Sequence, residues 1–192
     1  MTSSLTCGSA NFAKDREERP KTMASICGNL ARSMALQITI FSGGQTGVDR
    51  AALDAAVEKG LGYRGWCPRG GSAEDLPEPP GLVARYPHLR ETPEADPAER
   101  TRRNVRDSDR LLVLTDSSGI TVSKGTELAR DVALTLGRPC LVLELGAGDA
   151  LEQARTFLDV GEEDIAVCIA GPRESEAPGI YAKARAFLRR LL

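Results

Sequence analysis

A glycine-rich stretch between an apolar run and an alanine-rich segment constrains the fold of this chain most strongly. The stretch runs from Ser42 to Arg50 and has the sequence SGGQTGVDR. The apolar run before it, residues 36–41, predicts a buried strand. The alanine-rich segment after it, residues 51–59, predicts a helix that ends at Gly60.

This strand, glycine turn and helix start together have the features of an anion-binding site. Three glycines let the backbone turn sharply and approach a ligand with no Cβ in the way. The first N–H groups of a helix have no partner within the helix, and the helix dipole adds partial positive charge there, so phosphate groups bind at such places. The candidate ligand-binding residues in this stretch are Ser42, Gly43, Gly44, Gln45, Thr46, Gly47, Asp49 and Arg50.

A purely structural interpretation of the same residues stays open. Thr46 and Asp49 have the spacing of a capping box, so Asp49 could serve only to fix the helix start. The stretch also departs from two better-known phosphate-binding motifs. Ser42 stands where a dinucleotide fingerprint has its first glycine, and residues 47–49 are not the Gly-Lys-Ser/Thr of a P-loop.

Strand and helix signals alternate from Leu36 onward, which predicts an α/β fold. We expect a single three-layer Rossmann-like domain over residues 36–192, with a mostly parallel sheet and helices on both faces. Further strands are expected at 62–67, near 88–90, and at 111–114, 140–145 and 165–170. Further helices are expected at 98–107, 125–136, 149–160 and 180–192. Residues 1–35 contain a polar, charged stretch without a clear period, which predicts a poorly ordered N-terminal extension.

Four loops are expected to meet at one edge of this sheet. Ligands bind beyond the carboxyl ends of the strands in such a fold. The loops that should open there are residues 42–49, 68–72, 116–126 and 171–175. All four contain glycine, and three combine a hydroxyl with a basic residue. The convergence predicts a small anionic ligand, with Arg69, Arg173 and Ser175 as further candidates to contact it.

The composition limits the classes of partner. The 192 residues carry 25 lysines and arginines and 27 acidic residues, so the net charge of −2 predicts no general attraction to nucleic acid or to an anionic membrane. The sequence contains no apolar run of membrane-spanning length and no secretory signal pattern at its start. Five scattered cysteines predict reduced thiols in the cytoplasm and no structural metal site. The one histidine, His88, leaves little for His-based catalysis.

Four blocks of sequence, in order, resemble the molybdenum carrier proteins. They are residues 42–50, 65–70 (GWCPRG), 101–109 (TRRNVRDSD) and 170–181 (AGPRESEAPGIY). That family belongs to the Rossmann-like SLOG superfamily, together with the circularly permuted YpsA proteins and the LOG-type "lysine decarboxylase-like" enzymes.

The resemblance implies a ligand and partners. It implies a domain, often oligomeric, that holds molybdenum cofactor (molybdopterin) as cargo, or otherwise a nucleotide, over the glycine loops. Molybdoenzymes or molybdopterin-biosynthesis proteins would be its partners, and a homo-oligomer its expected state. The matched blocks add Asn104, Arg106, Asp109 and Glu174 to the candidate ligand-binding residues.

One departure bears on catalysis. LOG-type hydrolases carry P-G-G-x-G-T-x-x-E, in which the loop holds phosphate and the glutamate helps to cleave an N-glycosidic bond. The matching stretch here, residues 121–129, has the sequence TVSKGTELA, so Ser123, Lys124, Gly125 and Thr126 are candidates to bind phosphate. Ala129 replaces the glutamate, and Glu127 lies two positions earlier, about 200° around a helix.

We therefore expect binding rather than catalysis and assign no catalytic residue. The alternative that stays open is a nucleotide sensor, or a phosphoribohydrolase-like enzyme that acts on nucleotides or nucleoside monophosphates.

Overall fold

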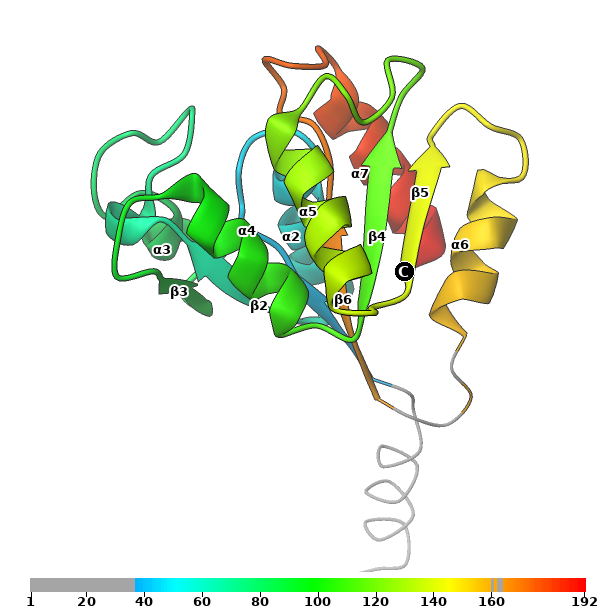
Figure 1. Cartoon of the computed structure of the whole chain (residues 1–192), viewed down its shortest axis with the longest axis horizontal. Coiled ribbons are helices and arrows are strands. Elements are labelled where there is room, and N and C mark those ends of the chain that lie inside the picture. The colour runs from blue at the N-terminus through cyan, green and yellow to red at the C-terminus, as the bar shows by residue number, and fades with distance from the viewer. Residues whose placement is uncertain (1–36, 160, 162–163) are drawn as a thin grey trace, which may run out of the picture. The chain divides into compact units, whose positions relative to one another are not determined.

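Six parallel strands form one sheet in the order β3-β2-β1-β6-β4-β5 (Figure 1). The computed structural model describes residues 37–159, 161 and 164–192. The predicted extension over residues 1–35 lies outside the described residues. The strands are β1 (Ile38–Phe41), β2 (Gly62–Cys67), β3 (Leu89–Glu91), β4 (Arg110–Thr115), β5 (Cys140–Glu144) and β6 (Ile165–Ala170).

The strand order places a topological switch point in the middle of the sheet. From β1 the chain runs outward to β2 and β3, and it then crosses to β4 and β5 on the other side. Strand β6 returns between β1 and β4, and it is parallel to both. The loops after β1, β6 and β4 therefore leave the sheet beside one another, which is where open α/β sheets bind ligands.

Helices cover both faces of the sheet. They are α2 (Val48–Lys59), α3 (Gly81–Arg85), α4 (Pro97–Arg106), α5 (Lys124–Thr135), α6 (Ala150–Leu158) and α7 (Ile180–Leu191), with a short 3-10 turn at Arg69–Gly71. Helices α2, α6 and α7 pack on one face, and α4 and α5 pack on the other (Figure 1). The prediction of a three-layer α/β fold is confirmed.

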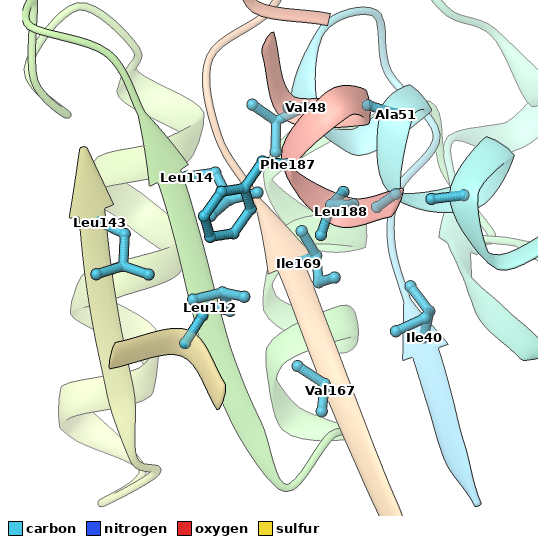
Figure 2. Packing of buried hydrophobic residues seen from close by; sticks show 14 of the residues in the cluster. Ile40, Val48, Ala51, Leu112, Leu114, Leu143, Val167, Ile169, Phe187 and Leu188 are labelled. Atoms are coloured by element: carbon cyan, nitrogen blue, oxygen red, sulfur yellow. The ribbon is translucent and has the colours of Figure 1, made fainter. Parts of the chain in front are cut away.

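Successive side chains along each strand point to opposite faces of the sheet, so a hydrophobic core forms on each face. In β4, Leu112 and Leu114 point toward α2, α6 and α7, whereas Leu111 and Val113 point toward α4 and α5. Figure 2 shows the first cluster, in which Phe187 of α7 lies over the sheet near Leu114. A strand buried on both faces must be apolar at consecutive positions, which is why residues 111–114 form an unbroken apolar run.

The structure adds one element to those expected from the sequence. Residues 81–85 form the short helix α3, where only loop and an edge strand were predicted. Its Leu82 is fully buried and packs with Leu53, Tyr86 and Leu89 beside the outer strands. The five-residue length gives too few turns for an amphipathic period to appear in the sequence.

Candidate functional site

A cavity of about 280 Å³ opens at the carboxyl ends of the strands, between the loops after β1 and β6 and the helices α4 and α5. The structure brings nine of the sequence-predicted site residues to its wall. They are Gly43, Gln45, Asp49, Asn104, Ser123, Lys124, Gly125, Thr126 and Arg173. These residues come from three of the four loops that the sequence placed at this edge, and from α4.

The start of α5 forms one side of the cavity. Ser123 caps the helix, because its side-chain oxygen accepts a hydrogen bond from the N–H of Thr126 at 3.3 Å. Its carbonyl oxygen also accepts from the N–H groups of Thr126 and Glu127. The N–H groups of Lys124 and Gly125 precede the first intrahelical donor, and they find no acceptor in the described part of the chain. This helix start therefore keeps donors for a ligand.

The side chain of Thr126 lies beside those free amides. The residue is only 2% exposed and lines the cavity. Its hydroxyl is the one fully buried side-chain polar atom without a hydrogen-bond partner among the residues that the structure describes. Buried hydroxyl groups are normally hydrogen-bonded, so an unpaired one beside a cavity calls for a ligand or water.

Asp49 forms the opposite side of the cavity. Its carboxylate contacts the guanidinium of Arg100 on α4, with Oδ2 and Nη1 2.6 Å apart. Burial raises the pKa of this carboxyl, whereas Arg100 and the backbone N–H groups of Gln45 and Gly43 lower it by stabilising the ionised form. The backbone donors of the glycine loop thus point at a carboxylate of the chain itself.

Gly43 makes room for Arg100. A Cβ on Gly43 would lie 1.8 Å from Nη1 of Arg100 and 2.7 Å from its Cζ. The guanidinium therefore lies against the backbone of the glycine loop, a position that any side chain on residue 43 would block. Close approach of this kind is a use of glycine that does not depend on an unusual φ.

The remaining residues of the glycine loop make structural contacts. Ser42 donates to the carbonyl oxygen of Asp49 at 3.0 Å, and the side-chain oxygen of Gln45 accepts from the N–H groups of Thr46 and Glu74. Thr46 donates to Glu74, and Gly44 packs against leucine side chains. Gly47 is the N-cap of α2 without any side-chain cap, so the capping-box interpretation is wrong.

Arg50 is also used within the fold. Its side chain is 5% exposed and forms a two-pronged ion pair with Asp75, both contacts being 2.9 Å. Its Nε donates to the carbonyl oxygen of Gly44. The arginine thereby joins the glycine loop to the turn that holds Asp75, and it does not line the cavity.

The structure places five other predicted residues outside the cavity wall. Arg69 is exposed, and Arg106 is an exposed partner of Asp107. Asp109 precedes β4 and accepts from the N–H of Ala166 at 2.8 Å, at the amino ends of the strands and so at the opposite edge of the sheet. Glu174 accepts from the N–H groups of Gly179 and Tyr181 at the start of α7, and Ser175 is exposed.

Sequence reasoning missed Arg100. This arginine and Asn104 lie one helical turn apart on α4, and both line the cavity. The side-chain amide of Asn104 is hydrogen-bonded to the backbone of Trp66. Its Oδ1 accepts from the N–H of Trp66 at 2.7 Å, and its Nδ2 donates to the carbonyl oxygen at 3.0 Å. The i, i+4 spacing from Asn104 was the signal available in the sequence. It points to Arg100 and not to Arg106.

The cavity wall also contains apolar residues, together with the charged residues Asp96 and Arg173. Ala129, which stands at the position of the hydrolase glutamate, is buried and lines the cavity, whereas Glu127 does not. Cys168 of β6 also lines it, and burial raises the pKa of this thiol, which keeps it protonated at neutral pH.

The described residues contain neither a metal-binding cluster of side chains nor a membrane-spanning helix. No cluster of three or more histidine, cysteine, aspartate or glutamate side chains there is arranged to hold a metal ion. None of the helices in residues 37–159, 161 and 164–192 combines the length and apolar character that a membrane span needs.

Comparison with known proteins gives a consistent result. The profile of the family described as "Circularly permutated YpsA SLOG family" matches residues 40–192. The crystal structure of the "Putative molybdenum carrier protein" from Syntrophus aciditrophicus SB is 37% identical in sequence, covers 80% of this chain and 94% of its own, and superposes with a TM-score of 0.68. No curated protein matches the sequence. The match over four fifths of the chain, on the fold and cavity described above, shows that this protein belongs to the circularly permuted YpsA family of the SLOG superfamily.

Proposed function

We propose that this protein binds a small phosphorylated ligand in the cavity, with the phosphate at the start of α5. Molybdenum cofactor (molybdopterin), carried as cargo, is the first candidate, and a nucleotide is the second. The observation that carries the proposal is the buried, unpaired hydroxyl of Thr126, which lies at the cavity wall beside the free N–H groups of Lys124 and Gly125.

A phosphate fits this group of donors. A buried hydroxyl without a partner costs about 1–3 kcal/mol. A phosphate oxygen would accept its hydrogen bond once the threonine side chain turns toward the cavity, because the oxygen is covered in this structure. The free amides and the dipole of α5 favour negative charge at the same place. Lys124 is exposed and makes no ion pair with any described residue, so its ammonium group can add a charge-assisted contact.

The placement of the carboxylates supports binding rather than hydrolysis. Asp109 lies at the far edge of the sheet, and Glu174 holds the start of α7. Asp49 does reach the cavity, but Arg100 and two backbone amides already engage it. None of these carboxylates stands on the α5 turn where the hydrolases place their glutamate.

Thr126→Val tests the phosphate site. Valine keeps the shape of threonine and removes the hydroxyl, so binding of inorganic phosphate, measured by calorimetry, should weaken about tenfold or more. The ligand-free variant should be as stable as the parent or about 1 kcal/mol more stable, because an unpaired polar group has gone. A purely structural hydroxyl would give the opposite sign, a loss of stability without a loss of binding.

Thr135→Val is the matched control. Thr135 lies at the far end of the same helix, where its hydroxyl donates to the carbonyl oxygen of Asp131. This variant should bind phosphate as the parent does. Equal phosphate binding by Thr126→Val and Thr135→Val would overturn the proposal.

The name of the structural relative motivates the first candidate ligand. Mass spectrometry of the small molecules that co-purify under anaerobic conditions would identify the cargo. As a cofactor carrier, the protein would act in the cytoplasm as a homo-oligomer and pass its cargo between molybdopterin-biosynthesis proteins and molybdoenzymes. The free thiols of Cys67, Cys140 and Cys168 support a reducing compartment.

A further inference from the structure

Arg100 presents an unusual group to the cavity. Its side chain is 13% exposed, and Asp49, its ion-pair partner, is 6% exposed. An arginine side chain carries five N–H donors in a rigid plane. A single one of these, on Nη1, has an acceptor among the described residues, namely Oδ2 of Asp49.

The other donors of Arg100 are accessible from the cavity. Arg100 lines the cavity, and none of its nitrogens belongs to the fully buried unpaired atoms of the described chain. Nη1 is fixed between Gly43 and Asp49, so the Nε and Nη2 edge is left to face a ligand or water. A planar edge with two parallel donors suits two neighbouring acceptors.

The charge of Asp49 restricts which acceptors fit. The Arg100–Asp49 pair has no net charge, and its carboxylate would repel a second anion brought into the same small cavity. An uncharged pair of acceptors meets no such repulsion. Lys124 and Thr126 lie at the start of α5, and the residues that this helix start contributes to the cavity wall include no carboxylate.

Gln45 adds a donor to the same side. Its side-chain oxygen accepts from two backbone N–H groups, at 2.9 and 2.8 Å, which fixes the amide orientation. The amide nitrogen is left without an acceptor in the described part of the chain, and Gln45 lines the cavity. This side of the cavity is therefore rich in donors and carries no net charge.

We propose that Arg100 selects the ring of the ligand, and that Asp49 is its positioning residue. The ring is a heterocycle with a carbonyl beside an unprotonated ring nitrogen, as in oxopurines and oxidised pterins; a reduced pterin would offer the carbonyl alone. Arginine pairs with such an edge through two hydrogen bonds, whereas adenine presents an amino donor where the carbonyl would be. The proposal rests on the proposed function, since it assumes that the phosphate of the same ligand binds at α5.

Calorimetry with the full-length protein tests the selection. GMP and an oxidised pterin monophosphate should each bind about tenfold to a hundredfold more tightly than AMP. Arg100→Lys keeps the charge beside Asp49 and removes the planar edge. In this variant the preference for GMP over AMP should fall to near one, while the affinity for inorganic phosphate stays within about twofold of the parent.

Arg102→Lys is the matched control on the same helix. Arg102 is 56% exposed and does not line the cavity, so this variant should keep the full preference. AMP binding as tightly as GMP to the parent, or an unchanged preference in Arg100→Lys, would overturn the assignment of Arg100 and leave the phosphate site standing. Failure of inorganic phosphate and all three ligands to bind would instead overturn the proposed function.

Discussion

Two loops of this protein occupy similar positions in the fold but differ in how their polar groups are paired. The glycine loop at residues 42–47 and the loop before α5 at residues 116–123 each follow a central strand, and each leads into the start of a twelve-residue helix. Both bring glycine and hydroxyl residues to the carboxyl edge of the sheet. In the first loop, the hydroxyls of Ser42 and Thr46 donate to Asp49 and Glu74; at the second, the hydroxyl of Thr126 has no partner among the described residues.

The difference lies in Asp49 and Arg50. Asp49 receives the amides of Gly43 and Gln45 together with Arg100, and Arg50 ties the loop to Asp75. The start of α5 has Gly125 and Thr126 in the corresponding places, and these supply no internal anion. A glycine-rich helix start is therefore a binding site for an outside anion only where the chain does not provide its own.

Substitution of Asp49 is the strongest test of the difference between the two loops. Asp49→Ala should lower the free energy of unfolding by about 3–5 kcal/mol, because it leaves the largely covered guanidinium of Arg100 and the loop amides without their acceptor. Chemical denaturation at pH 7 measures the loss. Ser123→Ala, which removes the cap at the second loop, should cost only about 1 kcal/mol. Equal losses in the two variants would mean that the first loop does not depend on an internal anion.

The pH dependence of stability at Asp75 gives a second test of the same loop. Its hydrogen bonds with Arg50 lower the pKa of the Asp75 carboxyl, so its contribution to stability is present above the ordinary aspartate pKa and is lost as the pH falls. Asp75→Asn should therefore cost on the order of 1 kcal/mol at pH 7, a value reduced by the exposure of the carboxylate. The cost should shrink as the pH falls below about 4. A pH-independent difference between the two denaturation curves would show that the charge of Asp75 is not what matters.

The smallest effect is expected at Thr46, and it sharpens the contrast with Thr126. The Thr46 hydroxyl already donates to Glu74 on the surface, so Thr46→Val should leave the affinity for inorganic phosphate within about twofold of the parent. Thr126→Val should lose about tenfold or more under the same conditions. If calorimetry shows the larger loss for Thr46→Val, the phosphate lies at the first loop and the assignment of the two loops must be exchanged.

The contrast between Arg106 and Arg100 shows how far the sequence could lead. Helix α4 is rich in arginine and has a thin apolar face, with Thr101, Asn104 and Val105 as its buried residues. The side of such a helix that faces the sheet is weakly marked in the sequence. The block that resembles the family indicates Arg106, whereas Arg100 lines the cavity. Asp109 is a different case. It directly precedes a strand of a parallel sheet, so the topology alone places it at the edge opposite the cavity.

The parallel α/β sheet and the edge at which its glycine loops meet can be predicted from the amino-acid sequence, because apolar periodicity and glycine turns are local signals. Which of those loops keeps an unpaired hydroxyl depends on contacts between distant parts of the chain. The groups that occupy the first loop, Glu74, Asp75 and Arg100, lie 25 to 51 positions away from their partners in the chain. An ion pair forms wherever folding brings opposite charges together, and a contact across that separation leaves no local pattern in the sequence.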